Sequence, residues 1–284
     1  MTFRLRRSVL YMPGANERAL QKAKSLAADA LILDLEDSVA PEAKAAARER
    51  VASAVKGGGY GTRELVIRIN GLDTPWGAED MAMAAAASPD AILAPKVSSG
   101  ADVNRAVAMM KVASSRTRLW VMMETPLAIL NAKEIAGADR RLDCLVLGTN
   151  DLVKETRARI AGARFALLPM LSLCVLAART YGLDVIDGVY NDFKDEAGFR
   201  AECEQGRDLG MDGKTLIHPG QIAACNDVFS PAAEEVAWSR RIIAAFRMPE
   251  NSAKGVITID GRMVERLHLA MAERVVAIAG AASP

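Results

Sequence analysis

The sequence has few of the residues that mark several common classes of protein. It contains four cysteines and no Cys-x-x-Cys pair, which argues against a zinc site or a disulfide framework and favours free, buried thiols. Aromatic residues make up 5% of the chain and the formal net charge is +1, so a surface for nucleic acid or membranes is not indicated. No apolar stretch approaches the roughly 20 residues of a membrane-spanning helix, and the N-terminus lacks a signal peptide's apolar core. These absences predict a cytoplasmic protein.

What the chain does have is a regular alternation of two kinds of segment, built on 51% hydrophobic residues. Short, continuous apolar runs, typical of parallel strands covered on both faces, alternate with longer stretches whose apolar residues recur every three or four positions. The runs that we interpret as strands lie at residues 8–12, 30–35, 65–69, 91–95, 119–124, 144–148, 184–188 and 214–219. Eight strand–helix units predict an α/β fold, the TIM (β/α)8 barrel, with a doubly wound open sheet as the alternative.

The chain continues beyond what closing a barrel requires. We therefore expect two parts, a barrel over residues 1–230 and a C-terminal helical extension over residues 231–284. The extension contains one probable helix at Ala232–Arg247. A second helix is expected near the end of the chain, with Leu267, Met271, Val275 and Ile278 on one face.

Polar or ionisable side chains follow nearly every expected strand. They are Asp34, Glu36 and Asp37 after the second strand, Arg68 and Asn70 after the third, Lys96, Glu124, Asn150 with Asp151, Asp187, and His218. Any one of these polar residues could be there simply because loops after strands are exposed to solvent. Convergence in a single pocket at the carboxyl ends of the strands, where TIM barrels place their active sites, explains the whole set better.

Glu124 is the clearest of these residues, because it ends the apolar run of LWVMMETP. Together with Asp151 from the next strand it would give an oxygen-rich site suited to Mg²⁺ or Mn²⁺, with positions left open for substrate oxygens. Arg68 offers a planar set of donors for a carboxylate or oxyanion, unless a salt bridge to Glu36 or Asp37 occupies it. His218 is interpreted as a hydrogen-bonded structural residue in preference to a catalytic one.

The same segments carry a resemblance to a known family. The sequence resembles the citrate lyase β-subunit-like, HpcH/HpaI-type family, and within it especially the malyl-CoA and citramalyl-CoA lyases. The resemblance runs over nearly the whole chain, through RSVLYMPG, DLEDSVAPEAK, IRINGLDT, APKV, METPLAILNAKEIAG, IDGVYNDFKDEAGF, GKTLIHPGQI and DGRMVERLH.

This resemblance implies a TIM barrel with a C-terminal extension, assembled as a homotrimer or homohexamer. Glu124 and Asp151 would be the Mg²⁺ ligands, Arg68 would hold substrate oxygens, and Arg7 would lie toward coenzyme A. In such lyases the C-terminal segment of a neighbouring subunit reaches over the site with an acidic residue. Glu265, in Met-Val-Glu where the family often has Met-Ile-Asp, matches that residue and is one methylene longer.

From this resemblance we predict a Mg²⁺-dependent acyl-CoA lyase. The reaction would be reversible Claisen-type cleavage of a 3-hydroxyacyl-CoA, such as malyl-CoA or citramalyl-CoA, to acetyl-CoA and a 2-oxo acid. Arg68 would stabilise the developing oxyanion, and Glu265 of the neighbouring chain would transfer the proton at the acetyl carbon. A malyl-CoA thioesterase using the same pocket is the first alternative. A CoA-independent aldolase and a citrate lyase β-like subunit that serves an acyl carrier are the others.

Overall fold

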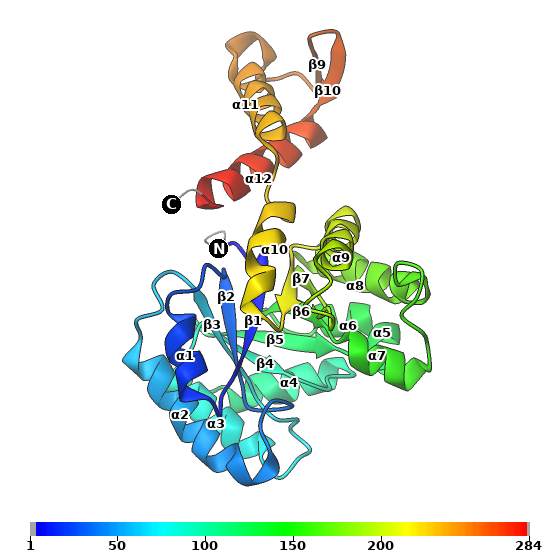
Figure 1. Ribbon diagram of the computed structural model, residues 1–284. Coiled ribbons are helices and arrows are strands. Elements are labelled where there is room, and N and C mark those ends of the chain that lie inside the picture. The colour runs from blue at the N-terminus through cyan, green and yellow to red at the C-terminus, as the bar shows by residue number, and fades with distance from the viewer. Residues whose placement is uncertain (1–3, 283–284) are drawn as a thin grey trace. The chain divides into compact units, whose positions relative to one another are not determined.

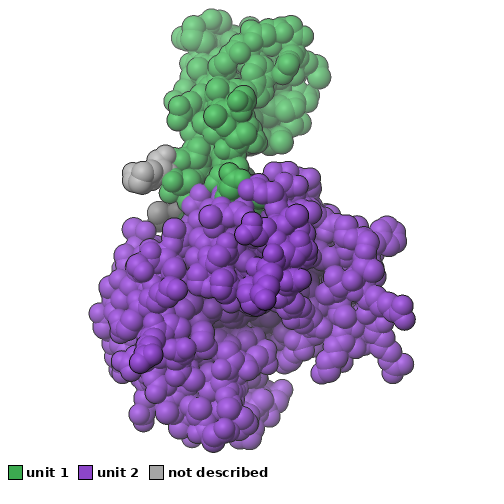
Figure 2. All heavy atoms as spheres, viewed as in Figure 1, with its two compact units in different colours: residues 1–5, 227–284 green, residues 6–226 purple. Residues whose placement is uncertain are grey.

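The protein consists of two compact units, shown in two colours in Figure 2. The computed structural model describes residues 4–282 (Figure 1). The barrel unit comprises Arg6–Asn226, and the C-terminal unit comprises residues 4–5 and 227–282 of the described chain. From the sequence, this boundary was expected at residue 230.

The barrel unit is a closed barrel of eight parallel strands, as predicted, which excludes the open sheet. The strands are β1 (Ser8–Pro13), β2 (Ala30–Asp34), β3 (Glu64–Arg68), β4 (Ala91–Ala94), β5 (Arg118–Met123), β6 (Leu142–Leu147), β7 (Asp184–Asp187) and β8 (Gly213–Leu216). Each strand pairs with its neighbours in sequence, and β1 closes the barrel on β8 with Ser8 opposite Lys214. The last strand ends at Leu216 rather than at residue 219, because Pro219 has no N–H for a ladder and begins a 3₁₀ turn.

Side chains fill the inside of the barrel, so it is a core and not a channel. Residues two positions apart on a strand share a face, and the inward set forms one buried cluster. It consists of Val9, Ala30, Ile32, Val66, Ala91, Leu93, Trp120, Met122, Cys144, Val146 and Ile186, with Tyr11 packed against it. The alternate residues, such as Leu31 and Ile92, are equally buried and face outward to the helices. Burial on both faces explains why the strands are continuous apolar runs.

Helices follow the strands around the barrel (Figure 1). They are α1 (Glu17–Ala23), α2 (Lys44–Gly57), α3 (Gly77–Ala87), α4 (Gly100–Met109), α5 (Pro126–Leu130), α6 (Ala132–Ala136), α7 (Thr149–Thr156), α8 (Leu168–Tyr181), α9 (Glu196–Asp208) and α10 (Ile222–Val228), with 3₁₀ turns η1 (Pro41–Ala43), η2 (Phe165–Leu167) and η3 (Pro219–Gln221). Side-chain caps fix several starts: Ser99 accepts from the N–H of Asp102, and Thr125 from that of Ala128. Thr125 and Pro126 therefore start a new helix directly after Glu124.

An ion-pair cluster closes the amino end of the barrel. The buried guanidinium of Arg6 lies 2.8 Å from Glu64, 2.5 Å from Asp143 and 2.8 Å from Asp184, which come from three different strands. The same guanidinium stacks on the indole of Trp120, with its carbon 4.8 Å from the ring centre. Because each partner is buried or half-buried and paired, this charge cluster can be held inside the fold.

The C-terminal unit is partly helical, as expected, but it also contains a β-hairpin that was not predicted from the sequence. Its elements are α11 (Ala233–Arg247), η4 (Pro249–Asn251), β9 (Val256–Ile259), β10 (Arg262–Glu265) and α12 (Arg266–Ala282). Asp260 and Gly261 form the two-residue turn between antiparallel β9 and β10, and both have positive φ, at 50° and 76°. An Asp-Gly pair between apolar runs is the usual signal for such a hairpin.

One face of α12 stays uncovered within the C-terminal unit. Val264 and Ala272 are buried with residues of α11, whereas Leu267 and Met271 are 55% and 62% exposed. The predicted face of the final helix is therefore exposed at Leu267 and Met271 and half-buried at Val275 and Ile278. All four cysteines are buried and free, as predicted. No helix in residues 4–282 is both long and apolar enough to cross a membrane.

Candidate active site

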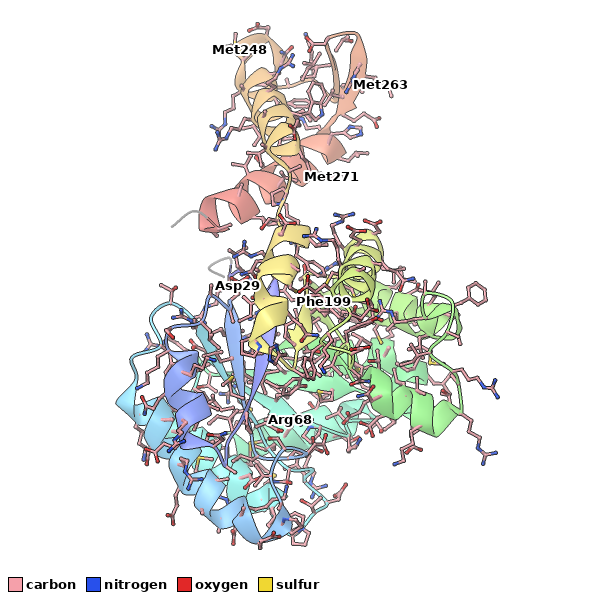
Figure 3. All side chains as sticks on the ribbon, viewed as in Figure 1. Asp29, Arg68, Phe199, Met248, Met263 and Met271 are labelled. Carbon is pink, nitrogen blue, oxygen red and sulfur yellow. The ribbon has the colours of Figure 1, made fainter. Side chains whose placement is uncertain are left out.

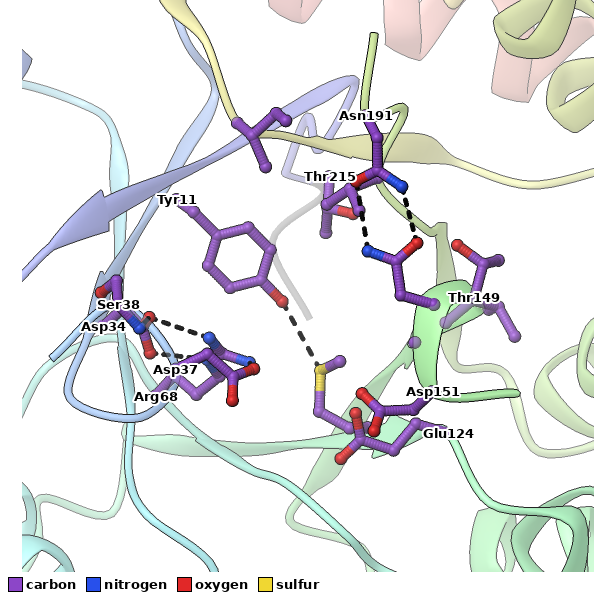
Figure 4. A pocket seen from close by; sticks show the side chains of 16 residues that line it. Tyr11, Asp34, Asp37, Ser38, Arg68, Glu124, Thr149, Asp151, Asn191 and Thr215 are labelled. Atoms are coloured by element: carbon purple, nitrogen blue, oxygen red, sulfur yellow. Dashed lines mark hydrogen bonds and ion pairs between the residues drawn. The ribbon is translucent and has the colours of Figure 1, made fainter. Parts of the chain in front are cut away.

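A cavity of about 310 Å³ opens at the carboxyl ends of the barrel strands (Figure 4). It is lined by Tyr11, Asp34, Asp37, Ser38, Arg68, Met122, Glu124, Leu147, Gly148, Thr149, Asn150, Asp151, Val189, Asn191, Thr215 and Ile217. Most of the polar residues that follow the expected strands come together here. This is the end of a TIM barrel where loops and strand ends supply catalytic groups.

Arg68 ends β3, and three carboxylates hold its guanidinium. Nε and Nη2 donate to the two carboxylate oxygens of Asp34 at 2.6 and 2.8 Å. Nη1 donates to Asp37 at 3.1 Å and lies 2.7 Å from Oε2 of Glu36. The salt bridges considered as an alternative from the sequence are therefore present, and Arg68 lines the cavity as well. A guanidinium has five N–H groups, so Nη2 retains an N–H beyond the one given to Asp34.

The acids beside Arg68 differ in protonation. Burial alone would raise the pKa of Asp34, but the charge of Arg68 and hydrogen bonds to the carboxylate bring that pKa below its usual range. For Glu36, whose side chain is 13% exposed, burial outweighs the attraction of Arg68 and raises the pKa to about 8. Asp34 is thus the permanent counter-ion of Arg68, while Glu36 is largely neutral at neutral pH.

Glu124 and Asp151 converge on a single cation, which in this structure is the ammonium of Lys96. Glu124 directly succeeds the last residue of β5 and is 1% exposed, and Asp151 lies in the first turn of α7. Nζ of Lys96 is 2.6 Å from Oδ1 of Asp151 and 3.5 Å from Oε1 of Glu124. The backbone N–H of Lys96 also donates to Oε1 of Glu124 at 2.8 Å. Burial raises the pKa of Glu124, with Lys96 acting in the opposite direction.

A glycine makes room for the Glu124 side chain. A Cβ added to Gly148 would lie 2.4 Å from Cβ and 2.7 Å from Oε2 of Glu124. Both distances are far shorter than van der Waals contact, so Glu124 could not keep its position beside a larger residue. The strand-to-helix turn after β6 is therefore shaped for the carboxylate of the neighbouring strand.

The donor set at this point suits a hard divalent cation. Two carboxylates directed at one positive charge leave the other coordination positions to water or substrate oxygens, as magnesium sites in enzymes usually do. No third His, Cys, Asp or Glu completes a cluster around a common point in residues 4–282, so the ligand set that zinc prefers is absent from the described chain.

Asp187, expected to enter the pocket, faces out of the barrel instead, because it follows the inward-facing Ile186 on β7 and lies against Gly206 of α9. Its carboxylate is fully buried and accepts from Arg164 at 2.8 and 3.0 Å and from Lys214 at 3.0 Å. The Lys214 ammonium also donates to the carbonyl of Gly188 at 2.5 Å. This buried network joins β7, β8 and the segment before α8, and so supports the wall of the cavity.

Two further residues that follow strands make hydrogen bonds that hold nearby segments of the chain. Asn70 donates to the carbonyl of Leu35 at 2.8 Å and to Asp80 at 2.6 Å. His218 caps η3, because its Nδ1 accepts from the N–H of Gly220 at 3.1 Å. The contacts of His218 agree with its interpretation as a structural residue.

Arg7, expected to lie toward coenzyme A, is not among the residues that line this cavity. Arg7 precedes β1 at the amino end of the barrel, and its guanidinium is paired with Asp29 at 2.9 Å. The pocket opens at the other end, and Figure 3 labels Asp29 and Arg68 on these two sides of the barrel. Arg7 therefore does not join the cavity of its own chain. Glu265 belongs to the C-terminal unit, where it ends β10 and its N–H donates to Nδ1 of His268 at 2.9 Å.

The uncharged polar side chains of the cavity were not predicted from the sequence. These are Tyr11, Ser38, Thr149, Asn191 and Thr215. Sequence reasoning picked out residues just past the strand ends, whereas Tyr11 and Thr215 lie inside strands. Alternation along β1 could have found Tyr11, because it is two residues after the inward-facing Val9.

Comparisons with known proteins agree with this geometry. A (3S)-malyl-CoA thioesterase of Cereibacter sphaeroides is 51% identical to the chain over 275 residues, which cover 97% of this chain and 95% of that protein. The citrate lyase subunit beta of Escherichia coli strain K12 is 35% identical over 269 residues, covering 92% and 89%.

Among solved structures, protein CitE of Mycobacterium tuberculosis in complex with magnesium, acetoacetate and coenzyme A superposes with a TM-score of 0.78. It is 29% identical, and the match covers 99% of this chain and 100% of that one. Magnesium and coenzyme A, both expected from the sequence, are present in that relative. Residues 7–219 match the family described as HpcH/HpaI aldolase/citrate lyase. With this barrel, this cavity and these relatives, the chain belongs to the HpcH/HpaI aldolase/citrate lyase family.

Proposed function

We propose that the protein is a magnesium-dependent enzyme acting on a short 3-hydroxyacyl-CoA of the malyl-CoA type. The convergence of Glu124 and Asp151 on one cation, in a cavity whose opposite wall carries Arg68, is the observation on which the proposal depends. The 51% identity with a malyl-CoA thioesterase and the likeness to a protein that holds magnesium and coenzyme A support the choice of substrate.

Each of these residues has a distinct role in the proposal. Glu124 and Asp151 hold the metal ion, which when bound lowers the pKa of a substrate hydroxyl and polarises a carbonyl. Arg68 directs its remaining N–H at a substrate oxygen, and its three acidic neighbours fix the guanidinium in place. The carboxylate of Asp34 is the main anchor, because it makes two of the bonds to Arg68.

Proton transfer is assigned to Glu265 of a neighbouring copy of the chain. Met263, Leu267 and Met271 are more than half exposed within the C-terminal unit, which supports the burial of this surface on another subunit. A homotrimer or homohexamer would satisfy this requirement, and light scattering of the purified protein would test it. A monomer with full activity would contradict the role of Glu265.

Hydrolysis of the thioester is the first candidate reaction, because the 51% identical relative is a thioesterase. A water oxygen bonds to the thioester carbon, the carbon–sulfur bond breaks, and the sulfur takes up a proton, giving malate and free CoA. The second candidate is the lyase reaction favoured from the sequence. There the hydroxyl loses its proton, the carbon–carbon bond breaks, and the acetyl-CoA enolate is protonated, leaving glyoxylate, or pyruvate from citramalyl-CoA.

Product analysis by mass spectrometry tests the proposal and separates the two reactions. We expect (3S)-malyl-CoA with Mg²⁺ to give malate and CoA if hydrolysis dominates, or glyoxylate and acetyl-CoA if cleavage does. Glu124→Ala should lose both activities and keep its fold, whereas Glu155→Ala, an exposed acid in the same helix as Asp151, should remain active. Absence of turnover of malyl-CoA and citramalyl-CoA by the wild-type oligomer would contradict the proposal.

A further inference from the structure

Tyr11 forms part of the cavity although it is not a strand-end residue. It lies on β1, its ring packs against the buried cluster inside the barrel, and its side chain lines the cavity. In Figure 4 the hydroxyl points into the cavity, with Arg68 on one side and Glu124 and Asp151 on the other. It therefore stands between the two groups to which the proposed function assigns the substrate and the metal.

The Tyr11 hydroxyl has no strong acceptor within the described chain. The one partner that the structure gives it in residues 4–282 is the thioether sulfur of Met122, at 3.6 Å. A thioether is a weak acceptor, so the hydroxyl retains the capacity to donate to a stronger acceptor in the cavity. An oxygen atom of a bound ligand would supply the missing partner.

The hydroxyl is available as a donor at every pH of interest. Burial raises the pKa of Tyr11 well above its usual value, although the nearby charge of Arg68 acts in the opposite direction. The guanidinium of Arg68 also lies over the tyrosine ring, with its carbon 4.8 Å from the ring centre. The two side chains thus form one wall of the cavity, and both direct N–H or O–H donors into it.

Carboxylates make up most of the charge on the rest of this cavity. A substrate with an acidic end would meet Asp34, Glu124 and Asp151, and would be repelled unless donors and a cation faced it. Each carboxylate oxygen can accept more than one hydrogen bond, so Arg68 and Tyr11 can serve the same acid group. An apolar acyl group would leave both donors unused.

We infer that Tyr11 is a substrate-binding residue that recognises the acid end of the substrate, its hydroxyl donating to a carboxylate oxygen of a 2-hydroxy or 2-oxo acid group. This inference rests on the proposed function, because it places that group between Arg68 and the pair Glu124 and Asp151. Tyr11 would then favour acyl groups that end in a carboxylate over neutral ones of the same length.

Calorimetric titration of pyruvate in the presence of Mg²⁺ tests the inference. Tyr11→Phe keeps the ring and its packing and removes only the hydroxyl, so we expect about tenfold weaker pyruvate binding. Binding of Mg²⁺ alone should change by less than about twofold, since the hydroxyl bonds to the sulfur of Met122 and not to the proposed metal ligands. Thermal stability without ligand should be equal to or above that of the wild type.

Tyr60→Phe is the matched control. Tyr60 is buried, and its hydroxyl donates to the carbonyl of Leu20 at 3.2 Å, away from the cavity. This variant should lose stability and bind pyruvate like the wild type. If Tyr11→Phe binds pyruvate as the wild type does and loses stability as Tyr60→Phe does, Tyr11 is structural and the inference is wrong. A wild-type protein that binds no pyruvate with Mg²⁺ would overturn the inference, whereas the proposed function would fail only if malyl-CoA and citramalyl-CoA were not turned over either.

Discussion

The ammonium of Lys96 donates to Oδ1 of Asp151 at 2.6 Å, across the point where a metal ion is expected. Lys96 is held there by its backbone, which has a left-handed φ of 55° and donates to Glu124. A divalent cation held by Glu124 and Asp151, as proposed, would therefore compete with the lysine for the same carboxylates. We therefore expect the position of Lys96 to influence how strongly the proposed site binds Mg²⁺.

Replacing Lys96 by Met should tighten magnesium binding. The side chain is 46% exposed, so the ion pair is only partly shielded from water, and its loss should strengthen Mg²⁺ binding by roughly twofold to tenfold. Isothermal titration calorimetry of Mg²⁺ would measure the change. Lys154→Met removes an exposed ammonium on α7 and should leave the affinity unaltered. Weaker binding in Lys96→Met would show that the ammonium supports the site and does not compete with the metal.

Gly148→Ala should displace Glu124. The added Cβ would lie 2.4 Å from that of Glu124, so the carboxylate must move. Because metal sites depend on ligand position, we expect at least about tenfold weaker Mg²⁺ binding and a similar loss of turnover. Gly57→Ala, where an added Cβ would meet nothing within 4 Å, is the control and should change neither. Normal metal binding in Gly148→Ala would argue against Glu124 as a ligand.

Glu36 should make stability fall as the pH rises. The folded protein holds a proton on Glu36 up to a pKa of about 8, whereas the unfolded chain releases it near 4.5. The folded state binds more protons in this window, so this contribution is complete below the lower pKa and is lost as the pH approaches 8. Glu36→Gln should remove a slope of up to about 1.4 kcal/mol per pH unit from the free energy of unfolding. Denaturant unfolding between these pH values would measure it.

The exposed residue Glu42 provides the comparison for that experiment. Glu42→Gln should leave the pH profile of stability as it is in the wild type. Identical slopes for the wild type and Glu36→Gln would mean that Glu36 does not retain a proton in the folded protein.

Lys214→Met should destabilise the barrel. The ammonium is fully buried and neutralises Asp187 together with Arg164, so its removal leaves buried carboxylate charge poorly compensated. We expect a loss of about 3 kcal/mol in the free energy of unfolding. Chemical denaturation of Arg207→Met, which removes an exposed ion pair with Asp208, should show a change of about 0.5 kcal/mol or less. Equal effects in the two variants would contradict a stabilising role for the buried network.

The barrel could be predicted because each of its strands is marked by a pattern within a short stretch of sequence. Strands buried on both faces are continuous apolar runs, and seven of the eight expected strands end within one residue of the observed ones. The hairpin of the C-terminal unit was missed because Val256–Ile259 is short and next to strong helical patterns. Its Asp260-Gly261 turn was nevertheless a readable signal.

The sequence allowed us to predict which charged residues line the cavity, but not which of them pair with one another. Glu124, Asp151 and Arg68 lie at or just past strand ends, so topology alone brings them to one end of the barrel. No local pattern shows that Arg68 is shared by three acids or that Asp187 pairs with Lys214. Those contacts join residues far apart in the sequence, and charge alone does not select among the partners. Arg7 precedes its strand and so lies at the opposite end of the barrel, and its expected contact with coenzyme A stays a prediction.

The ion-pair cluster around Arg6 and the candidate active site lie at opposite ends of the barrel. Arg6 links strands β3, β6 and β7 at the amino end of the barrel. Apolar side chains fill the interior, and the acidic residues at the carboxyl end do not contribute to that core. We therefore expect that substitutions around the candidate active site can accumulate while the barrel stays folded. A change from thioester hydrolysis to carbon–carbon cleavage would need new loops or a repositioned acidic residue, and the barrel strands would not have to repack. Related proteins with this barrel could therefore come to catalyse different reactions.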